Sequence, residues 1–153
     1  MAETRQFATF FLDGLFFGVE VLKVQEVIRY QEMTRVPLAA AVVQGLINLR
    51  GQIVTAVDLR RRLRLRERPA DQLPMNVVVR TDDGAVSLLV DEIGDVLEIA
   101  EDQMERPPET VDACARELLR GVYKLEGRLL LILDTERTVH LHDDGTHERE
   151  QAA

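Results

Sequence analysis

The sequence contains no tryptophan, a single cysteine (Cys114), a single serine (Ser87) and only three histidines. Nucleophilic and metal-dependent enzymes rely on these residue types, so their scarcity disfavours most enzyme classes. One cysteine cannot form a disulfide within the chain, which is consistent with a reducing compartment. Ser87 lacks the glycine-flanked turn of a hydrolase nucleophile, and Cys114 between two alanines is typical of a small packing residue. We therefore expect a binding protein.

Long hydrophobic runs are also absent. No aliphatic run, such as residues 129–133, approaches the roughly 20 residues that cross a bilayer. The first six residues lack the apolar stretch of a signal peptide. Nineteen basic residues against 27 acidic ones give a net charge of −8, which repels nucleic-acid phosphates and anionic membrane surfaces. We expect a cytoplasmic protein with no nucleic-acid partner and no direct membrane insertion.

The sequence does contain a series of short apolar segments separated by turn signals, in a composition that is 46% apolar and 30% charged. Such segments with intervening Gly and Asp are typical of β-hairpins. Four turn signals each separate two β-rich segments: Asp13-Gly14, Arg50-Gly51, Asp82-Asp83-Gly84 and Glu126-Gly127. Residues 64–74 are charged, carry two prolines and are typical of a linker.

Two stretches of the chain resemble each other at a spacing of 76 residues, namely residues 45–58 and 121–134. Four aligned columns are identical: Gly45/Gly121, Leu49/Leu125, Gly51/Gly127 and Asp58/Asp134. Upstream, Asp13-Gly14 matches Asp83-Gly84 at a spacing of 70, and Val19-Glu20 matches Val90-Asp91 at 71. We interpret the chain as two copies of one β unit whose loops differ in length.

Each half supplies about five short strands, and a sheet of that size removes its exposed edges most economically by curling into a barrel. The sequence therefore predicts an all-β fold with short helices, built from two small five-stranded β-barrels packed together. We expect a first barrel over 14–65 and a second over 74–134, with residues 6–13 able to exchange between them and 140–153 as a polar tail. Units this small have marginal cores, so we expect the halves to pack and leave a groove.

Three segments closely resemble the CheW family of chemotaxis coupling proteins: residues 22–28 (LKVQEVI), 34–37 (TRVP) and above all 45–60 (GLINLRGQIVTAVDLR). The resemblance extends from about Phe7 to Val139. It implies a single CheW-like domain over 1–153, made of two intertwined barrels of the Src-homology-3 type, without enzymatic activity, cofactor or metal.

The same resemblance implies a scaffold that links the cytoplasmic tip of chemoreceptors to the regulatory domain of the histidine kinase CheA. Other CheW-like scaffolds are further expected partners, in arrays at the inner face of the membrane. Val24, Glu26, Gly45 and Arg50 match family positions associated with receptor engagement, so the resemblance assigns them to a receptor-facing groove. From the residues alone, a solvated turn arginine is the favoured interpretation of Arg50, and close backbone packing is an equal alternative for Gly45.

Other chemistry-bearing residues have simpler interpretations. Asp58 and Asp134 each end a β-rich segment before a short helix, so we interpret them as helix caps and not as paired catalytic carboxylates. Residues 60–68 include six arginines, which indicates a solvated helix end, electrostatic steering towards an acidic partner or, against the net charge, a nucleic-acid contact. The three histidines lie at the polar tail, where we expect no metal site: His140, His142 and His147.

Overall fold

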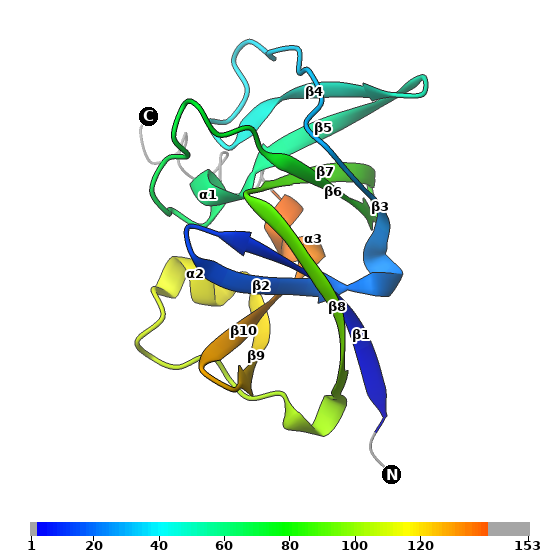
Figure 1. Cartoon of the computed structure of the whole chain (residues 1–153). Helices are drawn as coiled ribbons and strands as arrows, with labels where there is room; N and C mark the ends of the chain where they lie inside the picture. The colour runs from blue at the N-terminus through cyan, green and yellow to red at the C-terminus, as the bar shows by residue number, and fades with distance from the viewer. Residues whose placement is uncertain (1–2, 141–153) are drawn as a thin grey trace.

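The computed structural model describes residues 3–140, which form ten β-strands, three short α-helices and two 3-10 turns (Figure 1). The strands are β1 (Thr4–Leu12), β2 (Leu15–Glu20), β3 (Val24–Ile28), β4 (Val43–Leu49), β5 (Gln52–Asp58), β6 (Met75–Thr81), β7 (Gly84–Val90), β8 (Glu92–Ala100), β9 (Leu119–Leu125) and β10 (Arg128–Leu133). The helices are α1 (Leu59–Arg62), α2 (Ala113–Glu117) and α3 (Thr135–Val139), and the 3-10 turns are η1 (Val21–Lys23) and η2 (Glu101–Gln103).

The strands form two five-stranded sheets, one above the other in Figure 1. Sheet A has the order β8-β1-β2-β10-β9, and sheet B has the order β3-β6-β7-β5-β4. The two orders correspond strand by strand: β8, β1, β2, β10 and β9 of sheet A occupy the places of β3, β6, β7, β5 and β4 of sheet B. The parallel pair in each sheet, β10 with β2 and β5 with β7, is equivalent in the same way. The identical order confirms the internal duplication, and the all-β class with short helices is confirmed as well.

The two sheets do not follow the contiguous ranges expected from the sequence. Sheet B is built from residues 24–90 alone, whereas sheet A combines β1 and β2 with β8, β9 and β10. The bounds 14–65 and 74–134 are therefore corrected, and the whole hairpin of residues 4–20 joins the later strands, not only residues 6–13. A turn motif fixes which two strands form a hairpin, but long-range packing decides which sheet that hairpin joins.

One hydrophobic core lies between the sheets and is shared by both. From sheet A it includes Phe10 and Val19, which are fully buried, and from sheet B it includes Val79 and Leu88, also fully buried. Smaller clusters fill the rest of each sheet, with Phe7 and Tyr123 in sheet A. Because the main core draws on both sheets, neither sheet has a complete core of its own.

The helices are only four or five residues long. Two of them, α1 and α3, begin where the strands β5 and β10 end. Asp58 caps α1 by accepting a hydrogen bond from the Arg60 backbone N–H at 3.0 Å, and Asp134 caps α3 through the Arg137 N–H at 3.1 Å. Both capping interpretations are confirmed. Among residues 3–140, no helix is long and apolar enough to cross a membrane.

Candidate partner-binding site

Arg50 occupies the tight turn between β4 and β5. Arg50 and Gly51 both have positive φ angles, 51° and 90°, the left-handed conformation that glycine adopts readily. The Asn48 side-chain oxygen accepts a hydrogen bond from the Gly51 N–H at 2.9 Å and stabilises the turn. The Arg50 side chain is 73% exposed, so a well-ordered turn presents a guanidinium group to solvent.

The Arg50 guanidinium donates a hydrogen bond to the Glu26 carboxylate. Glu26 lies on β3, at one edge of sheet B, whereas β4 forms the opposite edge, so this ion pair joins the two edges. The hydrogen bond from Arg50, opposed by burial and helped by the charge of Arg50, holds the pKa of the Glu26 carboxyl below its usual range. The structure therefore brings together two of the four residues that the family resemblance assigns to a receptor-facing groove.

The other two residues, Val24 and Gly45, occupy different environments. Val24 is half-buried and packs against the shared core. Gly45 is buried, and a Cβ atom there would lie 2.7 Å from the Thr34 carbonyl oxygen and 3.0 Å from the Met33 Cβ. This close approach explains Gly45 by backbone packing; a direct contact of Gly45 with a partner stays a prediction.

Several apolar side chains close in sequence to Glu26 or Arg50 are exposed. Val27 follows Glu26 on β3 and is 40% exposed, and Ile53 follows the turn on β5 and is 60% exposed. Leu22, in η1 before β3, is 85% exposed. Because successive residues on a strand point to opposite faces, Val27 and Glu26 do not share a face of β3. The elements that carry the ion pair thus also expose apolar side chains, a composition suited to binding another protein.

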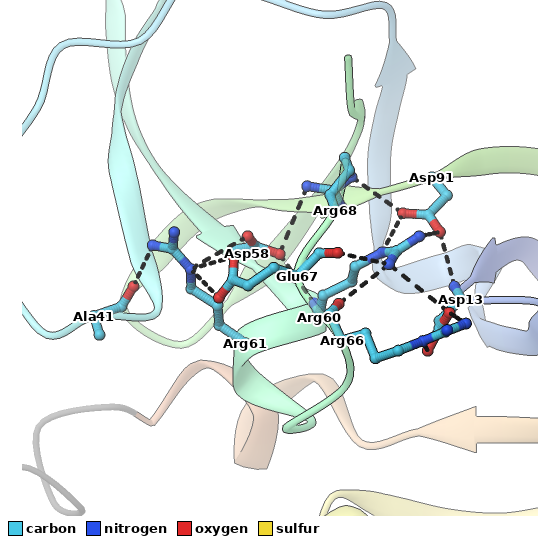
Figure 2. A network of polar contacts seen from close by, with 9 residues as sticks. All are labelled: Asp13, Ala41, Asp58, Arg60, Arg61, Arg66, Glu67, Arg68 and Asp91. Carbon is cyan, nitrogen blue, oxygen red and sulfur yellow. Dashed lines mark hydrogen bonds and ion pairs between the residues drawn. The ribbon is translucent and has the colours of Figure 1, made fainter. Parts of the chain in front are cut away.

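Most arginines of the basic stretch of residues 60–68 bind acceptors within the protein, which the sequence did not indicate; Figure 2 shows four of them. Two guanidinium groups meet at Asp91: Arg60 donates hydrogen bonds of 2.9 and 2.5 Å, and Arg68 donates one of 3.1 Å. Asp91 also accepts the Asp13 backbone N–H at 2.8 Å. Burial by itself raises the pKa of Asp91, but the hydrogen bond from Arg60, the Asp13 N–H and both cations hold that pKa below its usual range.

Three further arginines of the stretch also have partners. These contacts are Arg66 to Asp13 at 2.7 Å, Arg61 to Glu67 at 3.1 Å and Arg62 to the Thr138 carbonyl at 2.8 Å. The interpretation of 60–68 as a solvated helix end is therefore corrected, because Arg60 and Arg68 are buried and five of the six arginines bind acceptors of the chain itself. Because these arginines already bind groups of the chain itself, electrostatic steering of a partner and contact with nucleic acid by this stretch are disfavoured.

Polar groups of this network line an open depression of about 400 Å³ beside the β1–β2 turn. Its wall includes Phe11, Asp13 and Arg66, and none of the four residues expected in the receptor-facing groove. The only sequence signal for this site was the match between Val19-Glu20 and Val90-Asp91, which marks Asp91 as an equivalent position without naming its partners.

The remaining candidates have structural roles or fall outside the described residues. The buried Ser87 hydroxyl donates a 2.7 Å hydrogen bond to the Asn76 side-chain oxygen. Cys114 is half-buried on α2. No cluster of potential metal ligands occurs within residues 3–140. His140 lies 3.8 Å from Glu136, and His142 and His147 lie outside the described residues.

Comparison with known proteins assigns the fold and the family. A sequence model of the CheW-like domain matches residues 6–142. The chemotaxis protein CheW of Klebsiella aerogenes is 32% identical over 133 residues, covering 87% of this chain and 80% of that protein. CheW of Bacillus subtilis is 33% identical over 125 residues, covering 82% and 80%.

A solved structure is also similar. The crystal structure of the scaffolding protein TtCheW from Thermoanaerobacter tengcongensis superposes with a TM-score of 0.81 at 24% identity, covering 92% of this chain and 91% of that one. It supports the two-sheet fold independently of the sequence matches. The chain therefore belongs to the CheW family of chemotaxis proteins, which are not enzymes.

Proposed function

We propose that this protein acts in the cytoplasm as an adaptor between chemoreceptors and the histidine kinase CheA. The receptor's cytoplasmic tip binds the surface formed by β3 and the β4–β5 turn, and the regulatory domain of CheA binds a different surface of the two-sheet body. Other CheW-like scaffolds bind in the same arrays. The observation that supports this assignment best is the ion pair between Arg50 and Glu26, which joins two receptor-associated positions far apart in the sequence.

The chemistry of this surface suits a receptor tip with acidic and apolar side chains. Arg50 offers several N–H donors in a fixed plane, of which only part is used by Glu26, so the rest can bind receptor carboxylates or carbonyl groups. Exposed apolar side chains on the same elements, such as Val27 of β3 and Ile53 of β5, add apolar area for a partner. Gly45 acts indirectly, by letting residues 33–34 pack closely against β4.

Signal transfer in this proposal depends on binding free energies alone. An adaptor transmits a receptor's change of state only if it binds the two signalling states with different affinity, because equal affinities shift no equilibrium. The shared core makes the two sheets one body, so partners bound at separate surfaces are held in a defined relative geometry.

Replacing Arg50 tests the receptor surface. In co-sedimentation with purified receptor cytoplasmic fragments and CheA, Arg50→Ala should weaken receptor binding roughly tenfold while CheA binding persists. Arg106→Ala, which removes another exposed arginine from the loop after η2, is the matched control. Unchanged receptor binding by Arg50→Ala would contradict the assignment of this surface, and failure of the parent protein to bind either partner would contradict the function.

A further inference from the structure

Two fully buried polar side chains lie inside sheet B and bind each other. Asn76 of β6 and Ser87 of β7 are both 0% exposed, and the Ser87 hydroxyl donates a 2.7 Å hydrogen bond to the Asn76 side-chain oxygen. Val78 and Leu89 each lie two residues further along these strands and belong to the apolar cluster of sheet B. Because every second side chain of a strand points to the same face, the polar pair faces this cluster. Polar groups in such surroundings cost free energy unless they are hydrogen-bonded.

Asn76 also binds the backbone just past the end of β3. Its side-chain N–H donates a 3.0 Å hydrogen bond to the Arg29 carbonyl oxygen. The backbone pairing of β3 with β6 ends one residue earlier, where Ile28 lies opposite Asn76, so the side chain continues the pairing by one residue. Because a carbonyl oxygen can only accept, the amide must present its nitrogen to Arg29 and its oxygen to Ser87. The two hydrogen bonds together fix the orientation of Asn76.

The pairing of β3 itself is short and irregular. Its register with β6 shifts between Val24 and Glu26, and the regular pairs that follow are those of Glu26, Val27 and Ile28. Within residues 3–140, β3 is an edge strand of sheet B. Val24 and Ile28 pack in apolar clusters, but apolar contacts tolerate small displacements that break a hydrogen bond. A slip of one residue would turn Glu26 to the other face of the sheet, away from Arg50.

We propose that Asn76 and Ser87 are positioning residues: their hydrogen bonds hold the chain at Arg29, fix the register of β3 and so keep Glu26 within reach of Arg50. The bond acts at the point where β3 ends and the connection towards β4 begins. The effect on receptor binding rests on the proposed function; the hold on β3 does not.

Hydrogen exchange of the full-length protein, measured by mass spectrometry, tests this role with the double variant Asn76→Leu/Ser87→Ala. Replacing both partners by apolar side chains of similar size leaves neither of them unsatisfied, and the exposed Arg29 can bind water instead. The midpoint of urea unfolding should therefore stay close to that of the parent. Exchange in peptides covering residues 26–34 should nevertheless become roughly two- to tenfold faster, the factor that corresponds to one net hydrogen bond, while residues 43–58 keep the parent's rates.

Thr9→Val is the matched control. Thr9 is also buried, and its hydroxyl donates a 2.5 Å hydrogen bond to the Asp95 carbonyl oxygen, but both residues belong to sheet A. This variant removes a buried hydroxyl hydrogen bond of the same kind at another place. It should speed exchange in β1 and β8 and leave residues 26–34 at the parent's rates.

Exchange in residues 26–34 that is the same in the double variant and the parent would overturn the positioning role. So would faster exchange spread evenly over both sheets, because that pattern reports loss of global stability. In co-sedimentation, the double variant should bind the receptor fragment roughly two- to tenfold more weakly while CheA binding persists. Unchanged receptor binding would overturn the link between the register of β3 and the receptor surface. A parent protein that binds no receptor fragment would contradict the proposed function, while the exchange result would still decide the hold on β3.

Discussion

Gly45 makes the strongest single-residue prediction for stability. A Cβ atom at this position would lie 2.7 Å from a backbone oxygen of Thr34, which is itself held by two hydrogen bonds to Leu46 at 2.9 and 2.8 Å. Backbone held in this way cannot move aside cheaply, so Gly45→Ala should lower the free energy of unfolding by about 1–3 kcal/mol. Urea unfolding followed by circular dichroism measures this difference. A variant as stable as the parent would show that the segment of residues 33–34 yields without cost.

The repeat partner of Gly45 explains why its role was ambiguous in the sequence. At Gly121 an added Cβ would lie 2.8 Å from the Glu105 carbonyl oxygen, and Glu105 bridges to Val122 as Thr34 bridges to Leu46. At both glycines the missing side chain lets another segment of the chain, residues 33–34 or 104–105, pack directly against the strand. The sequence predicted that the two positions are equivalent, but the crossing segments lie outside the aligned block, so the packing itself was not predictable.

At the scale of elements, the segment of residues 64–74 is held in place by Asp91 through Arg68. Asp91→Asn should lower the free energy of unfolding at pH 7 by roughly 2–4 kcal/mol, because two buried guanidinium groups lose their shared countercharge. The matched control is Asp71→Asn, an exposed carboxylate in the same segment, which should change stability little. Urea unfolding of both variants at pH 7 measures the effect, and an equally small loss in both would contradict a structural role for the cluster.

The pH dependence of this contribution has a defined sign. Burial opposes ionisation of Asp91, but Arg60, the Asp13 N–H and Arg68 outweigh it, so the folded-state pKa lies below that of the unfolded chain, about 3.9. The stabilisation is therefore fully present above the unfolded pKa and is lost as the pH falls through the folded pKa. The stability gap between the parent and Asp91→Asn should narrow as the pH is lowered from about 5 towards 3.

Hairpins and helices that depend on residues close in sequence could be predicted. Contacts that depend on residues far along the chain could not. The four hairpins follow from turn residues that carry positive φ, and the short helices after Asp58 and Asp134 follow from their caps. The role of the 60–68 stretch was misinterpreted because its carboxylates lie far along the chain, 31 residues from Arg60 and 53 from Arg66. The net charge of a short stretch of sequence does not show which distant carboxylates its arginines bind.

At the scale of the molecule, the candidate site is assembled by the fold and not by any one segment. Glu26 and Arg50 are 24 residues apart and occupy opposite edges of sheet B. The resemblance to the CheW family named both residues, but nothing in the spacing of residues predicted their contact. The contact arises because the β4–β5 turn folds towards β3, which depends on the pairing of all five strands of sheet B.

The division of the chain between the sheets leads to a last prediction. Residues 24–90 contain every strand of sheet B, so a fragment with these bounds could in principle pair all its strands. It would, however, expose Val79 and Leu88, which pack in the full protein against Phe10 and Val19 of sheet A. Each such side chain contributes about 1.5–3 kcal/mol by burial, comparable in sum with the whole stability of a small domain. We therefore expect the fragment to lack stable structure and the full chain to unfold in one cooperative transition.

Two measurements decide this prediction. The fragment of residues 24–90 should give a poorly dispersed proton NMR spectrum, and adding a second fragment with residues 92–140 should not restore dispersion, because β1 and β2 are missing from both. Differential scanning calorimetry of the full protein should show a single transition whose calorimetric and van't Hoff enthalpies agree. A dispersed spectrum from the fragment, or two separate transitions in the full chain, would mean that sheet B is an independent domain. In that case partners bound to the two sheets would not be held in one fixed geometry, and the adaptor would need another way to relate them.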